Sequence, residues 1–284
     1  MFSVIRIHTN RGIYKIMKKK FGILTIVIFL MGILLTGCGQ TQKSKDTSWD
    51  DIKSKGKFIV GLDDSFPPMG FRDEKGQIVG FDIDMAKAVA EKLGVKVEFK
   101  PVDWDGVILS LNNKDIDVIW NGLSISEERK KQIDFSEVYL QNKQIIVVQK
   151  DSTINNKKDL SSKTVGLQMG STSEKALKAD TSTSKSLKEV RKYSNNTEAL
   201  LDLSQGRTDA VIVDEVVGRY YIEKKPGLYK ILDDNFGVED YGVGIRKTDT
   251  SFKEKLNEAL NTIKSDGTAD KISQKWFGKN IVTK

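Results

Sequence analysis

The order of short apolar runs and helical patterns constrains the fold of this chain more than any other feature. From Trp49 onward, apolar runs that read as buried strands alternate with segments of helical periodicity. The predicted strands are Phe58–Leu62, Val95–Phe99, Val118–Trp120, Ile145–Val148, Val165–Leu167 and Ala210–Val213. Strands that alternate with helices are typical of parallel sheets in α/β folds. We therefore predict two mostly parallel sheets, and with them two lobes and a cleft.

Helical spacing is clear in two segments. Apolar residues recur on one face within residues 83–93, and Gly94 follows as a C-cap. Near the end of the chain, an apolar stripe at i, i+4, i+7, i+8 and i+11 is formed by Phe252, Leu256, Ala259, Leu260 and Ile263. Ligands of open α/β sheets lie at the carboxyl ends of the strands, so polar residues just after the strand runs are the first site candidates.

The first 37 residues have the character of an export signal. They contain six basic residues and no acidic one, and Lys18–Lys20 precede the apolar stretch Phe21–Leu35. Fifteen residues rise about 22 Å as a helix, less than the roughly 30 Å hydrocarbon core of a membrane. We therefore expect a leader rather than a spanning segment, with Met17 as an alternative to Met1 for the start of translation.

The leader ends in Leu35-Thr36-Gly37-Cys38, which resembles the bacterial lipoprotein signal. That resemblance implies a lipidated Cys38 at the new N-terminus and anchoring to the extracytoplasmic face of the cell membrane, which needs two or more acyl chains to be stable. The alternative is a simple cleaved signal with a chance cysteine. Residues 38–51 are expected to form the lipidated cysteine and a polar, flexible tether.

Charge and rare residue types exclude several classes of function. The net charge of +7 comes mostly from the leader, since the rest of the chain has 40 Lys and Arg against 39 Asp and Glu. A nucleic-acid surface is therefore not indicated. His8 is the only histidine and Cys38 the only cysteine. A chain starting at Cys38 has no disulfide, no His- or Cys-based zinc site and no Ser-His-Asp or Cys-His pair. We expect no metal and no organic cofactor.

Polar segments follow the predicted strands in a recognisable order. They are Val60–Phe71, Gly80–Asp84, Asp103–Asp105, Asp117–Ser124, Glu128–Arg129, Phe135–Ser136, Gly170–Ser173, Gly206–Ala210, Asp214–Glu215, Gly267–Ile272 and Lys275–Gly278. Together they resemble the polar amino-acid-binding proteins of ABC importers, the family of the glutamine- and lysine/arginine/ornithine-binding proteins. The match runs from about Ile52 to Ile281, and its order and spacing are far more specific than any one segment.

The resemblance implies a two-lobed periplasmic-binding-protein fold of type II, in which two hinge strands join the lobes. Lobe 1 would comprise residues 52–144 plus 240–284, lobe 2 residues 149–236, with hinges near 144–150 and 237–243. The implied partners are one L-amino acid and the permease subunits of the importer. We expect a monomer, because a hinge that closes on one ligand needs no second copy.

Charged and helix-start residues match the family positions that hold the amino-acid backbone. Arg129 matches the arginine that pairs with the α-carboxylate, and a guanidinium fork binds both oxygens of such a group. Asp214 matches the aspartate that accepts the α-ammonium, and Thr172 matches a carboxylate-binding position at a helix start. Taken alone, Arg129 reads as a surface residue and Asp214 as a helix N-cap. Ser171 and Glu174 have capping-box spacing, so plain capping is the alternative for this segment.

Other residues match the walls and the side-chain end of the pocket. Phe66 and Trp104 match aromatic walls, although aromatics are more often core residues. Gly122 and Ser124 are expected to supply a backbone N–H and a hydroxyl. Asp63 matches the position that contacts the ligand side chain, and Asn121 and Gln168 occupy neighbouring positions.

Acids at the side-chain end favour a cationic ligand. Together with Asp63, Asp64 adds a second acid, so cystine or a basic amino acid is preferred and glutamine remains an option. The two aspartates can instead cap local turns.

Two other classes of function share this fold. Periplasmic cyclohexadienyl (arogenate-type) dehydratases resemble the same family, but such an enzyme needs an acid/base pair aimed at a ring substrate. Arg129 and Asp214 already account for a bound amino acid, so no catalysis is expected. A ligand sensor or adhesin is the third reading, and no signalling segment follows Gly278.

Overall fold

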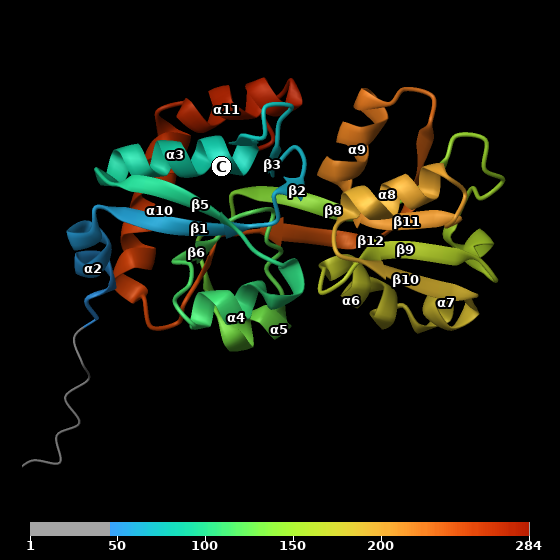
Figure 1. Ribbon diagram of the computed structural model, residues 1–284, viewed down its shortest axis with the longest axis horizontal. Coiled ribbons are helices and arrows are strands. Elements are labelled where there is room, and N and C mark those ends of the chain that lie inside the picture. Colours follow the sequence, from blue (N-terminus) through green and yellow to red (C-terminus); the bar gives the residue numbers. More distant parts are fainter. Residues whose placement is uncertain (1–45, 284) are drawn as a thin grey trace, which may run out of the picture. The chain divides into compact units, whose positions relative to one another are not determined.

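The computed structural model describes residues 46–283, in which the chain builds two five-stranded sheets (Figure 1). Residues 46–284 form one compact unit. The predicted leader and Cys38 lie outside the described residues. The expected tether reaches only partly into them.

The first sheet has the strand order β5-β1-β6-β13-β7. Strand β1 pairs in parallel with β5 and β6, whereas β13 is antiparallel to both β6 and β7. The strands are β1 (Lys57–Leu62), β5 (Lys96–Pro101), β6 (Val118–Ile119), β7 (Asp134–Phe135) and β13 (Gly244–Ile245).

The second sheet has the order β10-β9-β11-β8-β12. Strand β9 is parallel to β10 and β11, and β8 is antiparallel to β11 and β12. The strands are β8 (Leu140–Gln149), β9 (Thr164–Gln168), β10 (Glu189–Tyr193), β11 (Ala210–Asp214) and β12 (Tyr229–Tyr241). Both sheets are thus mixed, with two parallel and two antiparallel pairs each. This corrects the expectation of mostly parallel sheets.

Helices cover both sheets, as the alternation of strands and helices predicts (Figure 1). The buried face of α10 carries all five residues of the predicted stripe, and Gly94 ends α3 in the left-handed conformation. The helices are α2 (Ser48–Lys55), α3 (Phe81–Leu93), α4 (Val107–Asn112), α5 (Glu127–Gln132), α6 (Thr172–Ala179), α7 (Thr181–Ser186), α8 (Asn196–Ser204), α9 (Glu215–Lys224), α10 (Thr250–Ser265) and α11 (Thr268–Phe277), with 3₁₀ turns η1 (Trp104–Gly106) and η2 (Lys157–Leu160).

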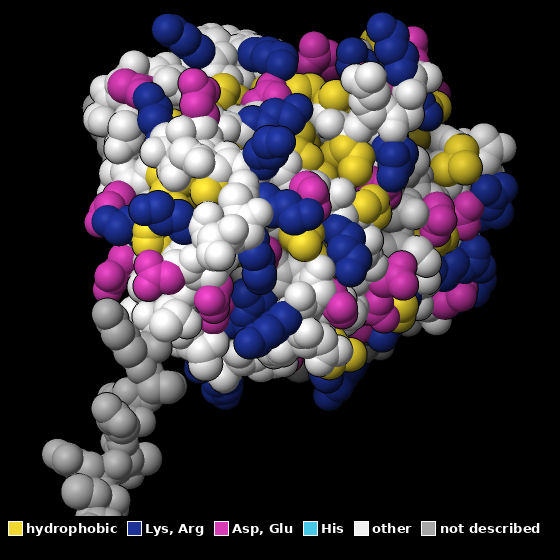
Figure 2. All heavy atoms as spheres, turned by 60° about the vertical axis from the view of Figure 1, so that its left-hand side comes forward, with side chains coloured by type: hydrophobic (Ala, Val, Ile, Leu, Met, Phe, Trp, Pro, Cys, Tyr) yellow, Lys and Arg dark blue, Asp and Glu magenta, His cyan; other side chains and the backbone are white. Residues whose placement is uncertain are grey.

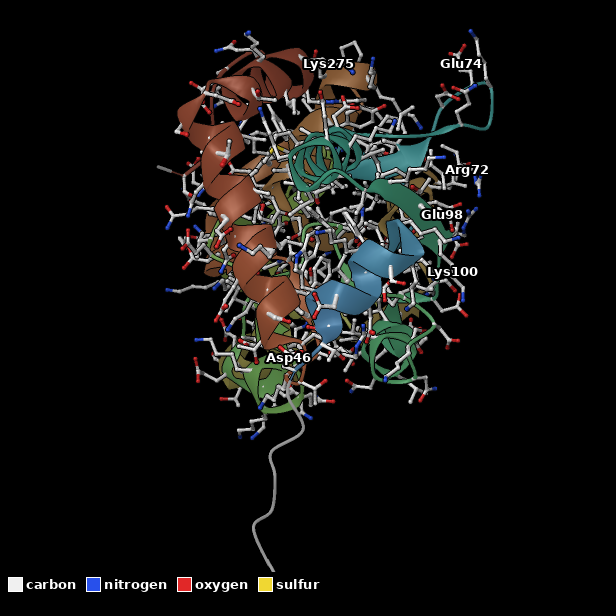
Figure 3. The ribbon with its side chains drawn as sticks, turned by 90° about the vertical axis from the view of Figure 1, so that its left-hand side faces the viewer. Asp46, Arg72, Glu74, Glu98, Lys100 and Lys275 are labelled. Atoms are coloured by element: carbon white, nitrogen blue, oxygen red, sulfur yellow. The ribbon has the colours of Figure 1, made fainter. Side chains whose placement is uncertain are left out.

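The N-terminal end of the described chain is ordered by contacts with α10. The side chain of Asp46 accepts a hydrogen bond from the backbone of Ser251 at the start of α10 (Figure 3). Trp49 stacks on Phe252 at 6.4 Å between ring centroids, and Ile52 is buried. Residues 48–51, which composition alone assigns to a tether, therefore form the first half of α2. Packing of the partly buried Trp49 and the buried Ile52 explains the difference.

Strands β8 and β12 are the two longest strands and form one antiparallel ladder. The ladder continues to Tyr241↔Leu140, close to the first sheet, and has register shifts near Asn235. A small third sheet, β2-β3-β4, follows β1 and consists of Ser65–Phe66, Gly70–Arg72 and Ile78–Val79.

Charges of both signs are intermingled on the face shown in Figure 2. Lys57–Glu98 and Lys275–Asp84 are examples of exposed ion pairs, which contribute little to stability. Among the described residues, no helix has the length and apolar character needed to cross a membrane.

Asp82, the second residue of α3, is a fully buried carboxyl that holds the loop after β6. Its Oδ2 accepts hydrogen bonds from the Gly122 N–H at 2.7 Å and from the Tyr139 hydroxyl at 3.0 Å. Burial raises the pKa of Asp82 to about 7, although both hydrogen bonds oppose that rise. The folded state thus favours the protonated form.

Asp82→Asn should remove a pH-dependent part of the stability. Because the folded pKa is raised, the contribution of Asp82 is complete below about pH 4 and is lost as the pH rises through 7, on the order of 4 kcal/mol in total. Urea unfolding of a form starting at Asp46, followed from pH 4 to 8, measures this. The free energy of unfolding of the wild type relative to the variant should fall with pH, and a constant difference would refute the assignment.

Candidate functional site

The residues that the sequence predicts for the site come together from the ends of strands of both sheets. Asp63 and Phe66 follow β1, and Ser124 follows β6. Gln168 ends β9 and Asp214 ends β11. A small pocket is lined by Ser171 and by eight of the ten predicted residues. The eight are Phe66, Trp104, Gly122, Ser124, Arg129, Gln168, Thr172 and Asp214. The two remaining residues, Asp63 and Asn121, lie directly behind this lining.

Arg129 is a buried cation between the two lobes, although it belongs to a charged helix. Only 3% of its surface is exposed. Its guanidinium donates to the Ser124 carbonyl at 2.9 Å and to the Gly170 carbonyl at 3.5 Å, and its Cζ lies 5.9 Å from the Trp104 ring centre. Burial lowers its pKa, while the nearby carboxylates of Glu239 and Asp214 act in the opposite direction. A guanidinium has five N–H donors, so donors remain for a bound carboxylate.

Asp214 stands at the N-cap position of α9, but its side chain makes no capping hydrogen bond. Instead its Oδ1 accepts from Asn142 at 2.7 Å, from Gln144 at 2.9 Å and from the Tyr241 hydroxyl. Burial first, and then the charge of Glu239, raise the pKa of Asp214 well above its usual range. Among residues 46–283, Oδ2 accepts no hydrogen bond, which leaves this oxygen for a cation in the pocket.

A chain of buried hydrogen bonds crosses from one lobe to the other at the side-chain end of the pocket. The Asp63 carboxylate accepts from Gln168 Nε2 at 2.7 Å and from the backbone of Ser65 at 2.9 Å. Asn196 Nδ2 donates to Gln168 Oε1 at 3.0 Å, which fixes the orientation of this amide. Burial raises the pKa of Asp63, against the effect of these hydrogen bonds.

The expectation that Asp64 adds a second acid to the side-chain end is wrong. Asp64 forms an ion pair with Arg72 at 2.6 Å and lines an outer groove rather than the pocket. Asn121 is placed behind the pocket, where its Oδ1 accepts from the Asp63 N–H at 3.2 Å.

The loop after β6 approaches the pocket closely at Gly122. Gly122 has φ +61°, and a Cβ there would lie 3.0 Å from the Phe66 ring. Its N–H, expected to face the ligand, donates to Asp82 instead. The Ser124 hydroxyl lies 3.0 Å from that of Thr172, across the two lobes.

The start of α6 is capped as its sequence predicts. Ser171 Oγ accepts from the Glu174 N–H at 3.3 Å, whereas the Glu174 carboxylate accepts from the Gly170 N–H at 2.9 Å. Capping and a place in the pocket therefore coexist in this segment, since both Ser171 and Thr172 line the pocket.

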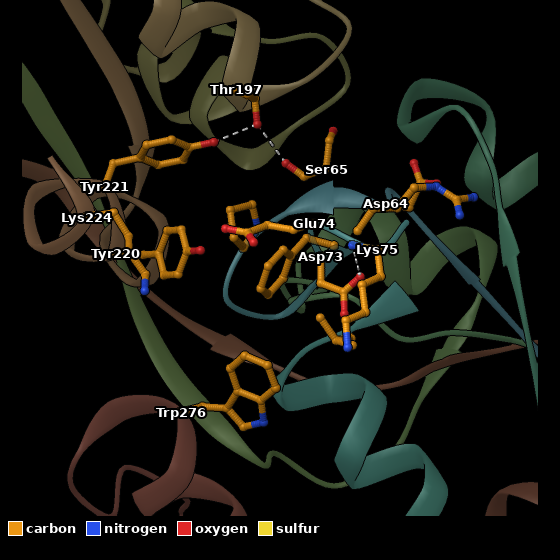
Figure 4. A pocket seen from close by; sticks show the side chains of 14 residues that line it. Asp64, Ser65, Asp73, Glu74, Lys75, Thr197, Tyr220, Tyr221, Lys224 and Trp276 are labelled. Carbon is orange, nitrogen blue, oxygen red and sulfur yellow. Dashed lines mark hydrogen bonds and ion pairs between the residues drawn. The ribbon is translucent and has the colours of Figure 1, made fainter. Parts of the chain in front are cut away.

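An outer groove of about 840 Å³ lies between the two lobes beside Asp63 (Figure 4). Thr197 of α8 donates to the Ser65 carbonyl at 3.0 Å and lies 2.8 Å from the Tyr221 hydroxyl. Phe71 packs against Tyr220 at 5.8 Å and against Trp276 at 5.9 Å. One wall thus comes from the segment after β1 together with α11, and the other from α8 and α9.

Sequence reasoning missed several polar residues next to the pocket: Asn142, Gln144, Asn196, Glu239 and Tyr241. Four of them lie on β8 and β12, and only the pairing of these long strands brings them to Asp214. Polar residues at alternate positions of β8, namely Asn142 and Gln144, were the available signal, because a strand places such residues on one face.

Comparison with known proteins settles the family. The pattern described as "Bacterial extracellular solute-binding proteins, family 3" matches residues 58–279. The chain belongs to this family.

Relatives in the family support this membership over most of the chain. The L-cystine-binding protein TcyJ of Escherichia coli K12 is 32% identical over 258 residues, which are 89% of this chain and 96% of TcyJ. The arginine-binding extracellular protein ArtP of Bacillus subtilis is 31% identical, covering 90% of this chain and 97% of ArtP. A histidine-bound substrate-binding protein of an ABC uptake transporter from Streptococcus pneumoniae superimposes with a TM-score of 0.82 at 38% identity, covering 85% of this chain and all of that one.

Gly170→Ala should weaken ligand binding by preventing close approach of the lobes. Gly170 has φ +71°, and a Cβ there would lie 2.9 Å from the backbone of Asp105 in the other lobe. We expect the dissociation constant to rise about tenfold or more, because the clash with Asp105, about 1–3 kcal/mol, falls on the closed form alone, whereas the cost of the positive φ falls on both forms. Isothermal titration calorimetry with an amino acid that binds the wild type measures this.

Gly206→Ala is the matched control. Gly206 has φ +68° but no atom within 4 Å of its Cβ position. It should lower the thermal stability slightly and leave the affinity unchanged. Equal affinity losses in both variants would contradict a role of Gly170 in lobe contact.

Proposed function

We propose that this protein is the extracytoplasmic solute-binding subunit of an amino-acid ABC importer, which closes its two lobes on one L-amino acid and delivers it to the permease. One observation carries the proposal: a buried guanidinium and a buried carboxylate, Arg129 and Asp214, line the same small pocket between the lobes. These are the two charges that an amino-acid zwitterion needs, and burying either end of the ligand unpaired is unfavourable.

In this proposal each part of the ligand has its own partners. The α-carboxylate pairs with Arg129 and the hydroxyls of Ser124 and Thr172, and the α-ammonium with Asp214. Phe66 and Trp104 enclose the side chain. Gly122 shapes the wall beside Phe66, since its own N–H is engaged by Asp82.

Closure requires a hinge, which we place at residues 144–150 and 237–243, within or next to β8 and β12. The resulting lobes are residues 52–144 plus 240–284 and residues 149–236. A ligand that binds the closed arrangement more tightly than the open one shifts the population toward closure. The permease then recognises the closed form, and a monomer suffices.

The ligand is proposed to be cystine or a basic amino acid. Asp63 and Gln168 close the side-chain end, and Asn121 lies behind Asp63, so this end offers a carboxylate and an amide to a cationic group. Relatives named for cystine and arginine binding support this choice. Glutamine is the alternative, because Asp63 already accepts hydrogen bonds from Gln168 and Ser65.

A thermal-shift screen tests the proposed function. A form starting at Asp46 is heated with each of the twenty amino acids, cystine and ornithine. At 100-fold excess over Kd, a ligand adds about 2.7 kcal/mol, or roughly 5–10 °C in Tm for a chain of this size. Arg129→Ala should lower affinity about 100-fold or more, because it leaves a buried carboxylate unpaired.

Arg207→Ala is the control, since this arginine forms an exposed pair with Asp202. It should retain the full shift. A shift with glutamine alone would keep the function and refute the preference for cations. Well-folded protein that responds to no amino acid would refute the function itself.

The anchor is also part of the proposal. Lipidation of Cys38, after removal of residues 1–37, would hold the protein at the extracytoplasmic face of the cell membrane. The supporting observation is the sequence alone, since Cys38 lies outside the described residues.

Cys38→Ser should release the protein from the membrane of a bacterial host. The wild type should enter the detergent phase on Triton X-114 separation, because two or more acyl chains anchor stably. Thr41→Ser is the control and should behave like the wild type. A Cys38→Ser protein that still partitions with detergent would count against the lipoprotein assignment.

A further inference from the structure

Two carboxylates share the same amide donors at the ladder of β8 and β12. Asn142 Nδ2 donates to Asp214 Oδ1 and to Glu239 Oε1, both at 2.7 Å. Gln144 Nε2 donates to Asp214 Oδ1 at 2.9 Å and to Glu239 Oε1 at 2.7 Å. Register explains the arrangement, because Glu239 is the direct cross-strand partner of Asn142, and Gln144 is the partner of Asp214.

The shared donors bring two like charges together. Since both oxygens lie 2.7 Å from the same nitrogen, their separation is at most twice that distance. Asp214 is buried and Glu239 half-buried, so solvent screens their repulsion poorly. Among residues 46–283, neither carboxylate has a Lys or Arg nitrogen within 4.0 Å.

The other ionisable groups around the pair do not cancel this repulsion. The charges of both carboxylates act to raise the pKa of Arg129 of α5, but its guanidinium donates its hydrogen bonds to the Ser124 and Gly170 carbonyls. The Tyr241 hydroxyl of β12 donates to Asp214 Oδ1, and burial raises the pKa of Tyr241 well above its usual value, so it stays a neutral donor. The elements β8 and α6 contribute only uncharged groups, those of Asn142, Gln144 and Thr172.

We propose that Asp214 and Glu239 hold one proton between them in the ligand-free protein, and that this proton leaves for solvent when an amino acid places its ammonium against Asp214. The inference rests on the proposed function, in which Asp214 is the ammonium partner. Glu239 acts through Asp214 and is a positioning residue rather than a ligand contact. Charge balances, since the ammonium replaces the proton. Closely spaced carboxylates commonly titrate as a pair in this way.

The direction of the pKa shift at Asp214 agrees with this arrangement. Burial, followed by the charge of Glu239, raises the pKa of Asp214 well above its usual range, so the proton is bound at a pH where an isolated Asp is ionised. A bound ammonium favours the ionised pair. Affinity should therefore rise with pH, by up to tenfold per unit below the upper pKa of the pair, and level off above it.

Calorimetry measures the proton directly. Binding enthalpies are recorded from pH 5 to 8.5 in buffers of different ionisation enthalpy, with the form starting at Asp46. The probe is L-arginine, L-cystine or L-glutamine, whichever gives the largest thermal shift. Histidine is avoided because its own side chain titrates in this range. The wild type should release up to one proton per ligand at the lower pH values.

Glu239→Gln and Asp240→Asn form a matched pair of variants. Glu239→Gln keeps an acceptor for Asn142 and Gln144, so it should still bind. Its proton release should be smaller than that of the wild type and shifted to lower pH, because burial still raises the pKa of Asp214. Asp240 is the next residue, and its side chain accepts a hydrogen bond only from Gln141 among residues 46–283, so Asp240→Asn should keep the wild-type release. Ligand binding by the wild type without proton release at any of these pH values would overturn the proposal, as would undiminished release by Glu239→Gln. Failure of every amino acid to bind would instead refute the proposed function.

Discussion

A charge cannot be buried in a protein without partners, and the contact between the two lobes of this molecule is organised by that constraint. Arg129 and Asp214 are almost inaccessible to solvent, yet no ion pair joins them, since each is held by uncharged groups. The guanidinium uses backbone carbonyls, and the carboxylate uses amides and a hydroxyl. Neutral partners satisfy the geometry of both groups without forming an ion pair between them, which leaves both available to the charged ends of the proposed ligand.

The scaffold places these groups by the simple geometry of strand ends. Side chains after β1 and β6 in one sheet and at the ends of β9 and β11 in the other converge, because each sheet directs these strand ends toward the other lobe (Figure 1). The long β8–β12 ladder supplies the remaining donors. The ladder therefore forms a wall of the charged site, and it contains or adjoins the residues at which we propose the hinge.

Much of this could be predicted from the sequence, and the omissions have identifiable causes. Apolar runs located β1, β5, β6, β8, β9 and β11, and the stripe from Phe252 to Ile263 located α10, because burial imposes periodicity directly. Strands β7, β10 and β13, most of β12 and the small β2-β3-β4 sheet escaped prediction, since pairing between distant segments leaves no local pattern. Glu239 escaped for the same reason: its partner Asn142 is remote in sequence. Asp64 was misplaced because its ion pair with Arg72 depends on how the chain folds back after β1, which composition does not show.

The outer groove in Figure 4 has a consequence of a different kind. Its walls belong to different lobes, with Phe71 on one side and Tyr220 on the other, so the proposed closure would change its shape. Any molecule that contacts both walls stabilises this arrangement of the two lobes by its binding free energy. Under the proposed closure, thermodynamic reciprocity requires that this molecule and the amino acid strengthen each other's binding by the same factor. The shape of the outer groove would thus differ between the ligand-bound and the ligand-free protein.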